Sequence, residues 1–204
     1  MRKYRYALAS AIAVALAMVF SPGGAEAITS NFHGSDSGTA TAVPIDLTGA
    51  SCAQVNLVEV CTTTSSLGIY AGKTSGSPFS GPFTGQSVSQ TVPVVGTGCS
   101  FAPTKIAACT IGSNTAGCLY SYVGGAGANR LSSSGDLFAF FLTGGSLCLD
   151  GNTLAFEGTQ TLVGVGGSGK AAGTGGGETT ETLRGQILLV DLAGNSFSWF
   201  TGSW

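Results

Sequence analysis

The last third of the chain alternates apolar and polar side chains in short segments that end at glycine-rich or asparagine-containing turns. In one such segment Leu154, Phe156 and Leu162 point to one side of an extended chain, while Thr159 and Thr161 point to the other. A period of two is that of a half-buried β-strand, which needs neighbouring strands. No stretch after the N-terminal leader carries a sustained helical period. We therefore expect an all-β fold, either a closed antiparallel β-barrel or, as the alternative, a β-sandwich.

Two further strands are predicted near the C-terminus. Residues 187–190 are all apolar and branched, and residues 193–195 form a turn signal that precedes Phe197. The pattern predicts a buried strand that turns back into a final aromatic strand, with Ile187 and Leu189 in the core.

The N-terminus has the organisation of a secretory leader. Three basic residues precede an uncharged apolar run over residues 7–20, and Ala25-Glu26-Ala27 follows. The apolar run is shorter than the roughly 20 residues that a membrane-spanning helix needs. We therefore predict a signal peptide over residues 1–27 that is cleaved on export, and a secreted, cell-surface or periplasmic protein. No later segment is long and apolar enough to be a spanning helix.

The charge balance argues against several classes of partner. Without the leader, five basic residues remain against nine acidic ones, and they form no basic cluster. Nucleic acids and anionic lipids are therefore not expected as partners. The expected partners are an apolar small molecule or another cell-surface component, and an oligomer is compatible with this composition.

All six cysteines follow the predicted cleavage site, and an even number in an exported chain is most simply three disulfides. Six cysteines allow 15 pairings, and the sequence does not choose among them. A metal site is not expected, because no C-x-x-C occurs and the single histidine is distant from every cysteine in sequence. The predicted disulfide cysteines are Cys52, Cys61, Cys99, Cys109, Cys118 and Cys148.

The remaining chain is expected to form one domain. Residues 28–42 are polar and contain glycine, which predicts a flexible N-terminal arm, and residues 43–204 would form the barrel. Within the barrel, residues 72–85 are predicted as a loop anchored by two phenylalanines. Three cysteines fall within or next to a Gly/Pro/Ser-rich segment at about 97–118, which we expect to be a disulfide-tied excursion from the sheet.

A glycine-rich segment over residues 164–170 matches G-x-G-x-x-G and most of a phosphate-binding loop. Both motifs bind phosphate because they open a helix whose first amide groups face the ligand. Here the residues that follow are too rich in glycine to begin a helix, and Ala171 occupies the position of the expected Ser or Thr. No cofactor is therefore predicted.

Two groups of residues are candidates for a functional site. Glu157 and Arg184 are charges within predicted strands and could meet inside a barrel as catalytic or ligand-binding groups, although a position facing water is favoured. Phe197, Trp199 and Trp204 could form a platform that stacks on a ligand, although packing of the last strand in the core is favoured.

The strand from Phe156 and the loop after it resemble the allene oxide cyclase-like and dirigent-like β-barrels. Their pattern is a strand with glycine followed by G-G-x-G-[KR]-F-x-G-x-x-G, and the matching positions are Gly166, Gly167, Gly169, Lys170, Gly173 and Gly176. The departure is Ala171, where the pattern has an aromatic residue that plugs the barrel end. The resemblance covers the last third of the chain. It implies an eight-stranded antiparallel barrel with an apolar interior, and no catalytic residue carries over.

Three functions remain open at this point. The first is an exported, disulfide-linked barrel that binds an apolar small molecule or another surface without catalysis. The second is a cyclase- or isomerase-like enzyme that confines a reactive apolar intermediate, with Glu157 as its ionisable group. The third is a structural cell-surface protein. A cavity that fits a ligand would distinguish the first two from the third.

Overall fold

The computed structural model describes residues 33–45, 52–55, 58–61, 64–77, 79–99, 106–172 and 175–204. The predicted signal peptide and residues 28–32 lie outside the described residues. Within them, no helix is long and apolar enough to cross a membrane. The elements are β1 His33–Ile45, β2 Cys52–Val55, β3 Val58–Cys61, β4 Thr64–Ser77, β5 Gly81–Pro93, β6 Ala108–Ile111, β7 Asn114–Leu131, β8 Leu137–Leu149, β9 Ala155–Gly167, the 3-10 turn η1 Gly169–Ala171, β10 Glu178–Val190 and β11 Ser196–Ser203.

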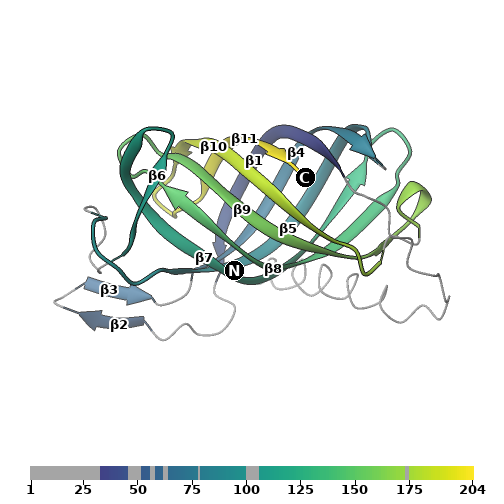
Figure 1. The fold of residues 1–204 in the computed structure, drawn as a ribbon. Helices are drawn as coiled ribbons and strands as arrows, with labels where there is room; N and C mark the ends of the chain where they lie inside the picture. Colours follow the sequence, from purple (N-terminus) through teal and green to yellow (C-terminus); the bar gives the residue numbers. More distant parts are fainter. Residues whose placement is uncertain are drawn as a thin grey trace.

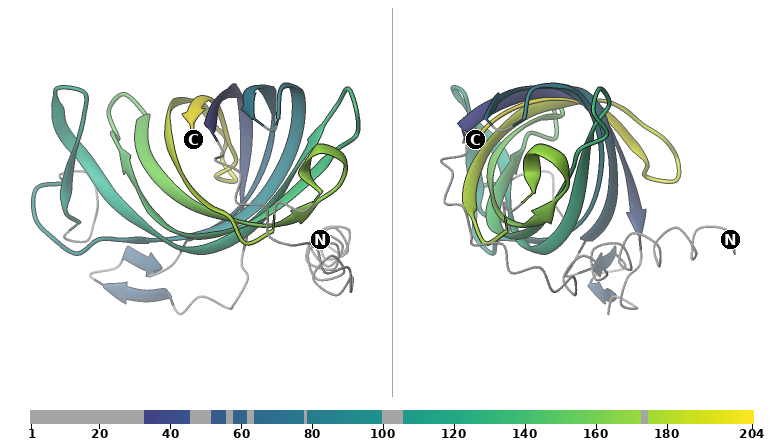
Figure 2. Two further views of the ribbon diagram at one scale, coloured as in Figure 1. Left: turned by 45° about the vertical axis from the view of Figure 1, so that its right-hand side comes forward. Right: turned by 90° about the vertical axis from the view of Figure 1, so that its right-hand side faces the viewer.

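Eight of these strands close an antiparallel barrel. Hydrogen-bonded neighbours follow in the order β5-β4-β1-β11-β10-β9-β8-β7, and β5 pairs with β7 to complete the ring. Figure 1 shows the strands crossing the molecule at a common tilt, and Figure 2 shows the ring along its axis. The predicted all-β fold and closed barrel are confirmed.

The first barrel strand lies in the segment that the sequence assigned to a flexible arm. From His33 on, β1 pairs with β4 on one side and with β11 on the other. Residues 33–42 are therefore part of the sheet, and the arm prediction is wrong for them. Between residues 33 and 42 the only apolar side chains are those of Ala40 and Ala42, and Gly38 packs directly on the Ala71 and Gly72 backbone. Such a strand has little of the hydrophobic pattern by which strands are recognised.

The cysteine-rich excursion is a short extension of the sheet. β6 pairs with the first part of β7, which runs beyond the closed ring. Two disulfides fix this region: Cys99–Cys118 with a Cα–Cα separation of 5.1 Å, and Cys109–Cys148, which ties β6 to β8 with a separation of 5.8 Å. Two of the three predicted disulfides are thus present among the described residues.

β2 and β3 form a separate two-stranded sheet. Its register places Cys52 opposite Cys61. The sequence predicts that both cysteines are bridged but does not choose a partner for either. We now expect them to bridge each other, because they are opposite in this register, and peptide mapping of the unreduced protein would test this pairing.

The glycine-rich loop covers one end of the barrel. After β9 the chain makes the single turn η1, seen in lime green within the ring in the second view of Figure 2. Ala171 is fully buried and packs with Phe79, Phe83 and Leu131. In the barrel pattern that the loop resembles, an aromatic residue plugs this end. Here the loop contributes a small alanine, and the phenylalanines of and before β5 supply the aromatic volume.

The end of β10 projects from the barrel, as the yellow hairpin tip in Figure 2 shows. The pairing with β11 shifts between Ile187 and Leu189, and the last β10–β9 pair is Gln186 with Ala155. Leu189 is 64 % exposed. The prediction that Leu189 belongs to the core is wrong. The register shift after Ile187 and the projecting hairpin place Leu189 outside the barrel wall.

Candidate binding cavity

The barrel encloses a cavity of about 280 Å³. That volume is close to the lower end of the roughly 300–1,000 Å³ of ligand pockets. Alternate residues of the barrel strands point inward, and most of the residues that line the cavity are aromatic or aliphatic. Representative apolar lining residues are Phe83, Leu131, Phe138, Phe140, Leu142 and Leu162.

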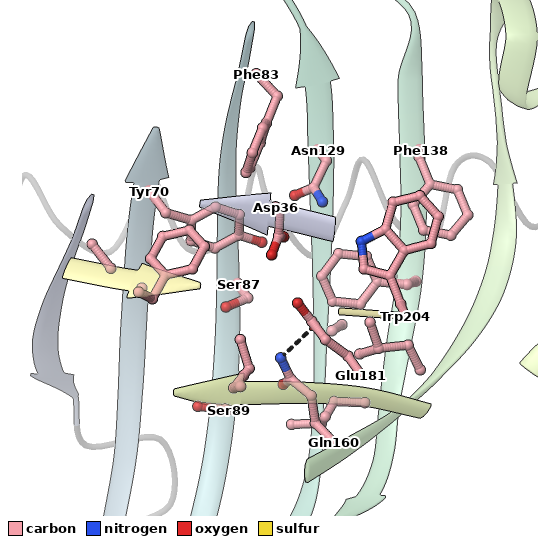
Figure 3. Close-up of a pocket in the computed structure, with 18 of the residues that line it drawn as sticks. Asp36, Tyr70, Phe83, Ser87, Ser89, Asn129, Phe138, Gln160, Glu181 and Trp204 are labelled. Carbon is pink, nitrogen blue, oxygen red and sulfur yellow. Dashed lines mark hydrogen bonds between the residues drawn. The ribbon is translucent and has the colours of Figure 1, made fainter. Parts of the chain in front are cut away.

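Two carboxyl side chains meet inside this apolar space. Asp36 comes from β1 and Glu181 from β10, and β11 lies between them. Their oxygens flank the position that a side chain at Gly202 would occupy, so the glycine leaves the room in which they approach. Figure 3 shows both carboxyls directed toward the same part of the cavity. Gln160, opposite Glu181 in the β9–β10 register, donates its side-chain Nε2 to Glu181 Oε2 at 2.8 Å.

Burial shifts the protonation of this pair. Glu181 is 6 % exposed, and burial, followed by the charge of Asp36, raises its pKa to about 8. Burial also raises the pKa of Asp36, while hydrogen bonding toward Glu181 and the nearby backbone opposes that rise. Near neutral pH the pair holds one proton, chiefly on Glu181, and carries one negative charge.

The surrounding polar groups do not neutralise that charge. None of the described residues that line the cavity is lysine, arginine or histidine. Asp36 Oδ1 and Asn129 Oδ1 are buried and have no hydrogen-bond partner in the described part of the chain. Burial raises the pKa values of Tyr70 and Tyr122, the latter to about 12, so both are neutral donors.

This arrangement can bind a polar group and can move a proton. A protonated Glu181 beside an ionised Asp36 offers one acid and one base in an apolar setting. A metal centre has less support, because no group of three or more His, Cys, Asp or Glu side chains converges in the described chain.

The two charged residues singled out by sequence are not among the residues that line the cavity. Glu157 and Arg184 are opposite each other in the β9–β10 register, so the structure brings their backbones together. Arg184 is exposed, and its Nε donates to Thr201 Oγ1 at 3.3 Å. Their neighbours Phe156 and Leu183 line the cavity instead.

The aromatic candidates divide between the two faces of the wall. Trp204 lines the cavity, whereas Phe197 and Trp199 are each 39 % exposed and are absent from its lining. The three residues therefore do not form one platform. The favoured prediction of core packing is wrong for Phe197 and Trp199.

Sequence reasoning missed Asp36 and Glu181. Asp36 lay in the segment assigned to the arm, and β10 begins at Glu178, earlier than the predicted strand. A signal was nevertheless present in β10: Glu181 and Leu183 are two residues apart and so share a face.

Comparisons of the chain with protein-family models, with curated proteins and with solved structures give no match.

Proposed function

We propose that this protein is a binding barrel that takes up a small, mainly apolar molecule. The observation that carries the proposal is the cavity of about 280 Å³ lined mostly by aromatic and aliphatic side chains. An internal cavity of this size has no role in the third hypothesis, in which only the outer surface acts.

Catalysis by the same cavity is the second candidate. It is favoured by the carboxyl pair, because Glu181 and Asp36 hold one proton between them beside apolar walls. In a cyclase- or isomerase-like reaction this pair would take the place that the sequence gave to Glu157. Membership of the allene oxide cyclase-like or dirigent-like barrels likewise remains a proposal, supported by the eight-stranded ring and by the loop at its end, whose Ala171 is buried.

Export is part of the same proposal. The two disulfides fit an oxidising compartment, and the leader sequence supports export independently.

The binding proposal is tested by filling the cavity. Ala40 lines the cavity and its neighbour Thr39 is exposed on the other face of β1. We expect Ala40→Phe to weaken the binding of the neutral dye Nile red at least about tenfold, and Thr39→Phe to leave it unchanged. Circular dichroism of both variants checks that the fold is intact.

Native mass spectrometry of protein purified from its source would show any retained molecule. If Nile red binds the two folded variants and the wild type alike, or binds none of them, and no molecule is retained, the barrel is not an apolar-ligand binder.

A further inference from the structure

We propose that the cavity selects a ligand with a protonated amine, which is held between the carboxyls of Asp36 and Glu181 while the apolar remainder fills the barrel. This inference rests on the proposed function, since it specifies the polar end of the molecule bound there.

The geometry places both carboxyls at one point. β1 and β10 are the two neighbours of β11, and Gly202 of β11 leaves the space between the two side chains open. Figure 3 shows the carboxyls of Asp36 and Glu181 and the hydroxyl of Tyr70 around the same part of the cavity. An ammonium group has three donors and no acceptor, so it matches a site made of convergent oxygen atoms.

Two acceptor atoms in this region are unused. Asp36 Oδ1 and Asn129 Oδ1 are inaccessible to water and have no hydrogen-bond partner in the described residues. A buried acceptor without a partner costs about 1–3 kcal/mol, which a ligand donor would recover once a side-chain rotation turns the oxygen toward the cavity. The unpartnered oxygen of Asn129 is independent of the carboxyl pair, because Asn129 comes from β7 on another part of the wall.

The charge of the cavity is one-sided. Its titratable side chains are Asp36 from β1, Glu181 from β10, Tyr70 from β4 and Tyr122 from β7. The described lining contributed by β5, β8, β9 and β11 contains none. A cation is therefore the complement of this site, whereas a carboxylate ligand would be repelled.

Aromatic rings complete the environment of a cation. Tyr70 packs edge-on against Phe83 and Phe200, with ring centroids 6.2 and 6.4 Å apart, and all three residues line the cavity. Aromatic faces attract ammonium groups within about 6 Å, most strongly where water is excluded.

Binding of the cation has a defined proton balance. In the free protein Glu181 carries the shared proton, whereas an ammonium group favours two ionised carboxylates. Uptake of R-NH3⁺ therefore releases up to one proton to solvent, and no covalent bond changes. Because the pKa of Glu181 is raised to about 8, amine affinity rises with pH up to that value and then levels off.

The test compares ligands that share an apolar group and differ in their polar end. The apolar group is octyl or 2-phenylethyl, and each carries a primary amine, a hydroxyl or a carboxylate, the carboxylate adding one carbon. Isothermal titration calorimetry at pH 7 and pH 9 measures affinity, and buffers of different ionisation enthalpy measure the protons released. For wild-type protein we expect each amine to bind at least about tenfold more tightly than its alcohol. The carboxylates should bind most weakly.

Two isosteric variants test which residues cause the preference for the amine over the alcohol. Asp36→Asn and Glu181→Gln should each reduce the preference for amine over alcohol by about tenfold, while the alcohol affinity changes little and reports an intact cavity. The matched control is Glu178→Gln, an exposed carboxyl on the same strand, which should bind like the wild type.

Several results would overturn the inference. Alcohols that bind as tightly as amines would show a binding barrel without cation selectivity, so the proposed function would stand and this inference would fail. The inference would also fail, and the proposed function would stand, if both variants kept the amine preference or if the carboxylates bound most tightly. If no compound of the series binds, this inference fails, while the Nile red experiment decides the proposed function separately.

Discussion

The inner and outer faces of β11 differ in an unexpected way. Phe200 and Gly202 face the cavity, where Gly202 makes room for two carboxyls, while Phe197 and Trp199 lie partly exposed on the outside. Beside β11 two carboxyls therefore lie inside the barrel and two large aromatic side chains lie outside it, although Phe200 and most of the cavity lining are apolar. In a barrel with a cavity, the alternation of a strand distinguishes two faces but does not by itself say which is the more polar.

The largest expected effect separates adjacent residues of β8. Phe140 is 7 % exposed and belongs to the interior cluster, whereas Phe141 is 41 % exposed. Phe140→Ala should lower the free energy of unfolding by about 3–5 kcal/mol, and Phe141→Ala by about 1 kcal/mol or less. Urea denaturation measures both. Similar values for the two would contradict the assignment of inner and outer faces.

The second effect is on the pH dependence of stability. Glu181 has a higher pKa in the folded protein, about 8, than the ordinary value of 4.5. The folded state therefore binds its proton more strongly, and the free energy of unfolding should fall by a few kcal/mol as pH rises through this window. Glu181→Gln should flatten most of this slope, leaving the smaller contribution of Asp36. Urea denaturation from pH 4.5 to 8 measures the free energy of unfolding of both proteins. If it depends on pH in the same way in Glu181→Gln as in the wild type, Glu181 is not a buried group with a raised pKa.

The third effect concerns the loop that covers the barrel end. Gly169 has a φ of 60°, and a side chain there would press on the carboxylate of Asp136. Gly169→Val should destabilise by about 1–3 kcal/mol, whereas the exposed Lys170→Ala should change stability by about 0.5 kcal/mol or less. Thermal denaturation compares them. If ATP bound at micromolar concentration and Lys170→Ala abolished that binding, the loop would have to be reinterpreted as a phosphate site.

The smallest effect is expected on the outside. Trp199 neighbours Thr39 and Gln186 on adjacent strands and is partly exposed. Trp199→Thr should change the free energy of unfolding by about 1 kcal/mol or less and leave Nile red binding unaltered. Fluorescence titration is the check, and a loss of binding would place Trp199 in contact with the ligand after all.

Much of the fold was predictable from local patterns. Strands with large alternating side chains, such as the one with Phe156 and Leu162, were recognised, and glycine turns together with the absence of helical periods indicated a barrel or a sandwich. Closure was not decided, because it depends on β5 pairing with β7 and on β1 entering between β4 and β11. These pairings join segments whose own sequences do not specify a partner.

The site was less predictable than the fold. Its carboxyls are separated by most of the chain and meet only because β1 and β10 flank the same strand. Glu157, the ionisable group of the enzyme hypothesis, is adjacent to Phe156 in the strand, so its side chain points to the opposite face and is absent from the cavity lining. A one-residue change of face is small along the sequence but decides between the solvent and the interior.

The pairing of β1 with β11 also constrains how the chain reaches its native state. Gly34 and Trp204 exchange backbone hydrogen bonds of 2.7 and 2.9 Å, so the residue that follows β11 is held against the beginning of β1. During synthesis β1 cannot gain this neighbour until β11 has been made, and β11 follows all the other barrel strands in chain order. The β1–β11 contact therefore has a very high sequence separation. The ring therefore closes only after β11 has been made, and a nascent chain that lacks β11 exposes strand edges that can pair with other molecules.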